Sequence, residues 1–301
     1  MKGRSWRLWL ACLAVCAWGL TGCGDSGKEE SAQAEQKEEA AEDSVPEKDF
    51  VPEEETVSEE APEAETAQEE EPAQETAPQM LITGNTKDWY DEENGNWLLH
   101  LEYADVEVQG EGFEAASESV AGWSRQLTEE LLAYGEELAQ MAGETADMSG
   151  RDLSDSYYYS LFEEPEVRRA DGRVVSLLVF HSQYTGGAHD IYGYNGFTFD
   201  ARTGEQLELG DILTDEETFR REATAYIIEE LKRQYGEGLF PDYEDTVEEM
   251  WEREPTWVLD ASGITFMFDP YAVGPFAMGP AEVTLPYELF GTYMIKDIWA
   301  E

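Results

Sequence analysis

An abrupt change in composition near residue 79 limits most strongly what this chain can fold into. Residues 24–79 consist mainly of Glu, Ala, Gln, Thr and Pro, and they carry 21 acidic and 3 basic residues with Phe50 as the one aromatic side chain. Such a segment cannot bury enough apolar surface to offset the entropy lost on ordering, and its like charges repel each other. We therefore predict an extended, disordered acidic tether that precedes a single folded region, residues 80–301.

Residues 1–22 have the pattern of a secretory signal. Three basic residues precede an apolar stretch of 13 residues, Leu8–Leu20, which is shorter than a comfortable membrane span. The stretch ends in "LTGC", and small residues before a cysteine resemble a bacterial lipobox. We predict a lipoprotein signal peptide over 1–22 and a lipidated Cys23 that begins the tether 23–79. The lipid would hold the protein at the extracytoplasmic face of the cell membrane. The alternative is an ordinary signal peptide followed by a chance cysteine.

Charge and cysteine content exclude several classes of function. The whole chain has a formal net charge of −49, and residues 80–301 alone carry 47 acidic and 13 basic residues. Nucleic acid is therefore an implausible partner, because phosphate binding needs clustered Lys and Arg, whereas a cationic partner is favoured. The remaining two cysteines lie in the signal segment, so the mature domain has no thiol for a disulfide, a nucleophile or a zinc site.

Hydrophobic periodicity predicts an α+β fold, with a mixed or antiparallel sheet packed against two main helices. The first helix carries an apolar stripe from Val120 to Met141 in steps of three and four residues, and Gly143 is positioned to end it. The second helix begins at a capping box formed by Thr214 and Glu217 and ends at Gly236. Both stripes are typical of core packing.

Alternation of apolar residues predicts the strands. Residues 96–108 form a strand with His100 on its more polar face, and Val174–Phe180 form a central strand that is apolar on both faces. Gly204 is placed for a hairpin turn. The length of the folded region suits one domain or two interlocked subdomains, about 80–185 and 186–301.

The stretch "HSQYTGGAHD", residues 181–190, gathers residues that are common in active sites. Ser182, His189 and Asp190 are the residue types of a hydrolase triad, but no G-x-S-x-G sequence surrounds a serine, and we predict no catalytic residues. His181 and His189 offer two metal ligands, fewer than a site needs. They share a sheet face only if the turn has three residues, 185–187, and lie on opposite faces if it has two, 186–187. We expect no metal and no cofactor.

Two loops have the composition of a binding surface. "QYTGG" supplies Tyr184, Thr185, Gly186 and Gly187, and the glycines allow close approach of a partner's backbone. "DPYAVGPFAMGP", residues 269–280, places Tyr271, Pro275 and Phe276 in a proline-rich loop with little conformational freedom. We predict that these seven residues contact a partner; the alternative is that the aromatic rings fold back into the core.

Three stretches together resemble a known extracytoplasmic domain: "YTGGAH", "GFTFDARTGEQLELGDIL" and "GITFMFDPYAVGPFAMGPAEVTLPY". The domain occurs in the extracellular half of RsiV-type anti-sigma factors and before the catalytic domain of PdaC-type peptidoglycan deacetylases. The resemblance covers about residues 97–289 and implies a mixed α+β fold. The chain departs from both types, because it has a lipobox and tether in place of a sigma-binding segment and lacks the deacetylase metal motifs.

The resemblance implies that the domain binds lysozyme, as the RsiV-type proteins do. We therefore expect a non-catalytic surface lipoprotein that binds lysozyme or another cationic muramidase. A peptidoglycan-binding module that assists cell-wall modification is the alternative implied by the deacetylases. An enzyme with an unrecognised site is a third hypothesis.

Overall fold

A computed structural model describes residues 77–149 and 159–299 of this protein. The predicted signal peptide, the lipidated Cys23 and the acidic tether up to residue 76 lie outside the described residues. The predicted end of the tether at residue 79 is wrong, because Gln79 is already the first residue of a strand. The described residues all belong to one compact unit. Within the described ranges, no helix combines the length and apolar composition needed to cross a membrane.

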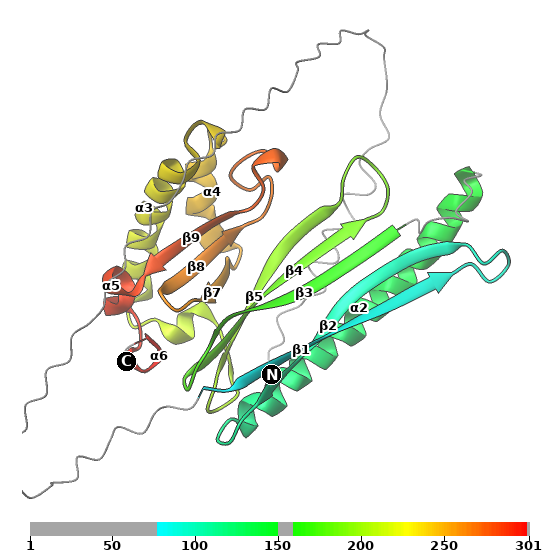
Figure 1. Ribbon diagram of the computed structural model, residues 1–301. Helices are drawn as coiled ribbons and strands as arrows, with labels where there is room; N and C mark the ends of the chain where they lie inside the picture. The colour runs from blue at the N-terminus through cyan, green and yellow to red at the C-terminus, as the bar shows by residue number, and fades with distance from the viewer. Residues whose placement is uncertain (1–76, 150–158, 300–301) are drawn as a thin grey trace, which may run out of the picture. The chain divides into compact units, whose positions relative to one another are not determined.

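The predicted α+β class is confirmed (Figure 1). Six strands form a mixed, curled sheet in the order β1 to β6, and three further strands form an antiparallel sheet in the order β7-β8-β9. The strands are β1 (Gln79–Tyr90), β2 (Trp97–Gln109), β3 (Tyr159–Ala170), β4 (Val174–Tyr184), β5 (Ile191–Asp200), β6 (Gln206–Leu207), β7 (Thr256–Leu259), β8 (Gly263–Phe268) and β9 (Ala281–Pro286). The helices are α2 (Glu114–Ser149), α3 (Glu216–Tyr235), α4 (Tyr243–Glu249), α5 (Tyr287–Phe290) and α6 (Lys296–Trp299).

The first sheet is made of antiparallel neighbours except at one place. β2 and β3 run parallel, a pairing that needs a long crossover, and the crossover contains α2. The parallel pairing covers four residue pairs, from Leu99 with Tyr159 to Glu102 with Phe162. Beyond Phe162, β3 continues beside β4 without β2 as a neighbour, so this edge of β3 has no paired strand among the described residues.

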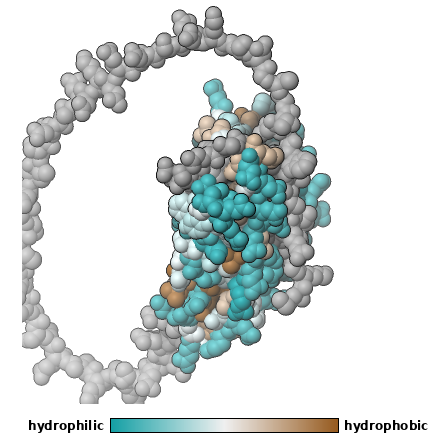
Figure 2. All heavy atoms as spheres, turned by 90° about the vertical axis from the view of Figure 1, so that its right-hand side faces the viewer, coloured by the Kyte–Doolittle hydropathy of each residue, from teal (hydrophilic) through white to brown (hydrophobic). Residues whose placement is uncertain are grey.

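The long helix α2 covers one face of the first sheet. The ring of Trp123 packs against Phe197 and Phe199 of β5, and the hydroxyl of Tyr134 donates a 2.8 Å hydrogen bond to Gln183 of β4. The predicted stripe is buried from Val120 to Leu138 apart from the half-buried Trp123, but its last member, Met141, is exposed. Figure 2 faces the right-hand side of Figure 1, where α2, β1 and β2 lie, and shows that side as predominantly hydrophilic.

The prediction that Gly143 ends the first helix is wrong, because α2 continues to Ser149. A single interior glycine costs about 1 kcal/mol relative to alanine, which a helix of 36 residues tolerates. Gly143 faces the side chain of Leu98 at ordinary contact distance, so it serves neither a turn nor a close approach.

The second sheet is covered on both faces. Alternate residues of β7, β8 and β9 join a core with α3 and α4, whereas Val258 and Met267 point the other way and pack against Leu178 of β4. The predicted four-residue repeat of α3 is confirmed, since Phe219, Ala223, Ile227 and Leu231 are all buried.

The start of α3 differs by one residue from the prediction. The N-cap is Asp215, whose carboxylate accepts a hydrogen bond from the backbone N–H of Thr218, so the expected capping box of Thr214 and Glu217 is wrong. Aspartate is a better N-cap than threonine, and its charge also suits the positive end of the helix dipole. The predicted end at Gly236 is confirmed.

A tight contact and an ion-pair cluster join the two sheets. At Gly196 of β5 the carbonyl oxygen of Trp257 lies where a Cβ atom would be, so only glycine allows this approach. Arg168 of β3 donates to Asp260 at 2.8 and 3.0 Å and to Glu282 of β9 at 2.6 Å. The second sheet is thereby held over one part of the first, and the remainder of that face stays open.

Candidate functional site

The connection between β4 and β5 is longer than either predicted turn. Residues 185–190 lie between the strands, and the last pair joins Gln183 to Ile191, so both expected registers are wrong. Gly186 and Gly187 have φ angles of 94° and 115°. Only glycine adopts such angles without steric strain, so these two residues make the wider turn possible. The hydroxyl of Ser182 donates a 2.6 Å hydrogen bond to Asp190 and ties the two ends of the loop together.

The two histidines of this stretch do not meet. His181 is buried in β4, opposite Glu163 of β3 and Gly193 of β5, and burial lowers its pKa to about 3. His189 is exposed in the loop, with Nδ1 at 2.7 Å from the backbone oxygen of Asp190. No group of three or more His, Cys, Asp or Glu side chains within the described ranges is arranged to hold a metal ion.

Ser182, His189 and Asp190 are not arranged as a catalytic triad. The serine hydroxyl bonds directly to the aspartate, without the histidine between them. The imidazole of His189 instead stacks on Phe276. The polar residues of this loop therefore stabilise its shape, and the histidine contributes an aromatic surface.

The loop between β8 and β9 places an aromatic side chain in solvent. Tyr271 is 57% exposed and has a φ of 69°, a left-handed conformation that is uncommon for a residue with a bulky side chain. Pro275 is exposed, and Phe276 is half-buried. The predicted alternatives were that these aromatic side chains contact a partner or fold back into the core. Tyr271 is exposed, as a partner contact requires, whereas Phe276 is neither fully exposed nor part of the core.

The two predicted loops come together through aromatic contacts. Phe276 stacks on His189 with ring centroids 3.9 Å apart, and it also contacts Tyr192 of β5 at 5.5 Å and Tyr271 at 5.6 Å. Tyr184 is half-buried, and its hydroxyl donates to the backbone oxygen of Gly187. We call the surface formed by residues 184–192 and 269–280 the two-loop surface.

A half-buried carboxyl group anchors the base of the two-loop surface. Asp269 accepts a 2.9 Å hydrogen bond from the backbone N–H of Tyr194, and burial raises the pKa of Asp269 to about 6. Gly193 leaves room for this carboxylate, since a Cβ atom there would lie 2.9 Å from its oxygens. The β8–β9 loop is therefore fixed to β5 at its first residue, which limits the motion of Tyr271.

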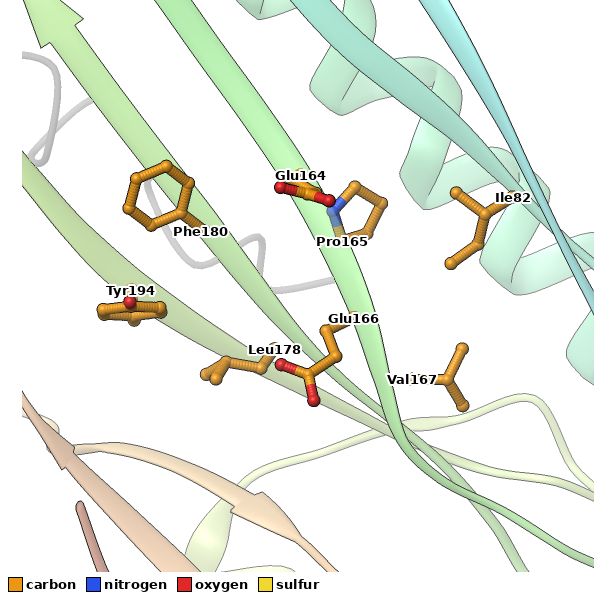
Figure 3. Close-up of a pocket in the computed structure, with 8 residues that line it drawn as sticks. All are labelled: Ile82, Glu164, Pro165, Glu166, Val167, Leu178, Phe180 and Tyr194. Atoms are coloured by element: carbon orange, nitrogen blue, oxygen red, sulfur yellow. The ribbon is translucent and has the colours of Figure 1, made fainter. Parts of the chain in front are cut away.

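An open hollow of about 610 Å³ lies beside the two-loop surface, around the middle of β3. We call it the β3 groove (Figure 3). It is lined by Ile82 of β1, residues 164–167 of β3, Leu178 and Phe180 of β4 and Tyr194 of β5. Its size is within the range of small-ligand sites, and it occupies the place where β2 and β3 separate.

Aromatic rings connect the β3 groove to the two-loop surface. Phe180 contacts Tyr194 at 5.5 Å and Tyr192 at 5.7 Å, and Tyr192 in turn contacts Phe276. Sequence reasoning did not identify Phe180, Tyr192 or Tyr194 as site residues. Alternation within β4 and β5 would have placed them on one face, but it does not indicate which part of that face the second sheet leaves open.

Two glutamates give the groove its charge. Glu164 and Glu166 are exposed, and Figure 3 shows their carboxylates on the side of β3 that faces Phe180 and Tyr194. Burial raises the pKa of the Tyr194 phenol, and neighbouring negative groups that include Glu166 raise it further. The groove is therefore an aromatic site in a negative field.

Comparison with known proteins identifies part of the chain. Residues 210–288, which contain α3, α4 and the second sheet, match a family described as a protein of unknown function (DUF3298), so the chain contains a DUF3298 domain. A search of the curated proteins found no match.

Two solved structures show the same fold. A DUF3298 family member from Bacteroides fragilis is 20% identical, with a TM-score of 0.55 over 74% of this chain and 96% of that one. A DUF3298 family protein from Pseudomonas aeruginosa is 15% identical, with a TM-score of 0.51 over 75% of this chain and 98% of that one. At these identities the likeness establishes the fold alone.

Proposed function

We propose that this protein is a non-catalytic, lipid-anchored surface protein that binds a cationic protein, most specifically lysozyme or another cationic muramidase. One observation carries the proposal: two loops about 85 residues apart in sequence meet at the stacked rings of His189 and Phe276 and present Tyr271 to solvent. An exposed aromatic side chain on a fixed loop is the usual anchor of a protein interface.

Charge supports the class of partner. Residues 80–301 carry an excess of 34 acidic residues, and opposite charge on a partner accelerates encounter and disfavours wrong partners. The resemblance of "YTGGAH" and "DPYAVGPFAMGP" to RsiV-type domains adds lysozyme as the specific candidate. The predicted lipid on Cys23 and the acidic tether would hold the domain away from the membrane, where a secreted enzyme is met first.

The decisive measurement is a calorimetric titration of the purified chain with lysozyme. We expect saturable binding at physiological salt that weakens as salt is raised, because screening reduces the attraction between the partners. Tyr271→Ala should lower the affinity roughly tenfold or more, as loss of an aromatic anchor does. Tyr90→Ala removes a tyrosine of similar exposure, 54%, from β1 and should change the affinity less than about twofold.

A peptidoglycan-binding module is the second candidate, favoured by the exposed aromatic rings and carboxylates of the β3 groove. The acid excess disfavours it, since anionic wall polymers would be repelled. Retention of the protein on purified sacculi, together with no heat of binding to lysozyme, would replace the first proposal by the second. Turnover of a wall substrate that is lost in His189→Ala would favour an enzyme instead.

A further inference from the structure

The lining of the β3 groove contains two carboxylates and no basic side chain. Within the described ranges, one basic side chain forms an ion pair with these glutamates: the guanidinium of Arg168 lies 3.9 Å from the carboxylate of Glu166. Arg168 is occupied, because it already donates to Asp260 and Glu282 at shorter distances. The negative charge of the groove is therefore not balanced by its own surroundings.

The aromatic flank of the groove suits the same kind of ligand. Phe180 and Tyr194 lie on the side of β3 to which the two glutamates point (Figure 3). A cation over an aromatic face is attracted by the ring quadrupole, and guanidinium groups stack on such rings. A carboxylate beside the ring adds a hydrogen-bond acceptor for the same group.

Two other occupants fit less well. A strand of a partner would pair poorly with β3, because Pro165 has no N–H to donate and charged neighbours discourage edge pairing. The acidic tether, residues 24–79, has a net charge of −18 and would be repelled by Glu164 and Glu166.

We infer that the β3 groove receives a basic side chain, arginine or lysine, of the cationic protein that docks on the two-loop surface. The inference rests on the proposed function and assigns a second anchoring point to the same partner. Contacts from Phe276 through Tyr192 to Phe180 make the two surfaces continuous, so one partner spans both. The basic group lies over the rings and pairs with the two glutamates.

The test uses a charge-neutral variant of nearly the same shape. Glu164→Gln combined with Glu166→Gln should weaken lysozyme binding about tenfold, since each charge pair contributes modestly. The matched control combines Glu136→Gln on α2 with Glu217→Gln on α3, which removes two exposed charges that do not line the groove. The control should change affinity less than about twofold. An unchanged melting temperature shows that both variants are folded.

A second probe examines the groove without the protein partner. N-acetylargininamide should shift the methyl resonances of Ile82, Val167 and Leu178 saturably in the unaltered chain and not in the double glutamine variant. If lysozyme does not bind but these shifts occur, the proposed function fails and the groove assignment stands. If lysozyme binds the double variant and the control equally well, the groove assignment is overturned and the proposed function stands. Absence of both effects overturns both.

Discussion

The two sheets of this protein differ in how completely their faces are covered. The three strands of the second sheet lie between α3 and α4 on one side and the first sheet on the other. The first sheet is covered by α2 on one face, but the second sheet reaches only part of the other. The β3 groove lies beside this open part, where β3 runs without β2. A fully enclosed sheet stabilises the fold, whereas a partly open one leaves aromatic side chains available to a ligand.

One phenylalanine from each sheet shows the contrast. Phe266 of β8 is fully buried and contacts Trp251, while Phe180 of β4 is half-buried and lines the groove. Phe180 lies on an open face, where a polar residue would be less costly in water. The energetic contribution of each ring should reflect this difference in burial.

The largest expected effect is on the enclosed sheet. Phe266→Ala should lower the free energy of unfolding by about 3–5 kcal/mol, through lost transfer energy and the cavity left behind. Phe180→Ala should lower it by only about 1 kcal/mol, a value typical of a partly exposed position. Denaturant unfolding of both variants measures the difference. Equal losses would mean that the face around the groove is as closed as the second sheet.

A buried carboxyl group distinguishes the covered face of the first sheet from its open face. Glu163 of β3 is 4% exposed, opposite His181, and no hydrogen bond to its Oε2 is made within the described ranges. Burial raises the pKa of Glu163 to about 8. Its neighbours on the sequence, Glu164 and Glu166, lie on the open face and are exposed.

The raised pKa of Glu163 makes the stability of the protein depend on pH. In the unfolded chain Glu163 ionises near its ordinary pKa of 4.5, whereas in the folded chain it stays protonated up to about pH 8. Its contribution to stability is therefore fully present below pH 4.5 and is lost as the pH rises through 8. The Glu163→Gln variant cannot ionise at this position and so has no such loss. The free energy of unfolding of the variant minus that of the unaltered chain should therefore increase by about 3 kcal/mol between pH 5 and pH 8.

Unfolding measured at several pH values checks this expectation, with Glu136→Gln on the exposed side of α2 as the control. The control should show no change in relative stability over the same range. A difference between Glu163→Gln and the unaltered chain that does not depend on pH would contradict the assignment of a buried, protonated carboxyl group.

Local periodicity explains which parts of the fold could be predicted. The repeat of Phe219, Ala223, Ile227 and Leu231 and the burial of Ile264 and Phe266 follow from side chains that are neighbours within one element. β1 was not predicted, because most of its residues are exposed on both faces and no alternation marks it.

The candidate site depends on non-local arrangements. Tyr271 and Phe276 were predicted from loop composition, but the contact of Phe276 with His189 depends on a six-residue turn whose length two glycines and the bond between Ser182 and Asp190 determine. The β3 groove depends on a parallel pairing of strands about 60 residues apart that stops after Phe162. No pattern within a single segment of the sequence contains this information.

The smallest expected effect concerns the helix over the covered face. The failed prediction at Gly143 suggests that this glycine has no structural role, in contrast to Gly196, where the carbonyl of Trp257 occupies the place of a Cβ atom. Gly143→Ala should therefore stabilise the protein by about 0.5–1 kcal/mol, because alanine loses less backbone entropy in a helix. The added methyl group would meet Leu98 at 3.9 Å, an ordinary contact. Thermal unfolding should show a small rise in melting temperature, and a fall would mean that α2 needs the glycine to approach β2.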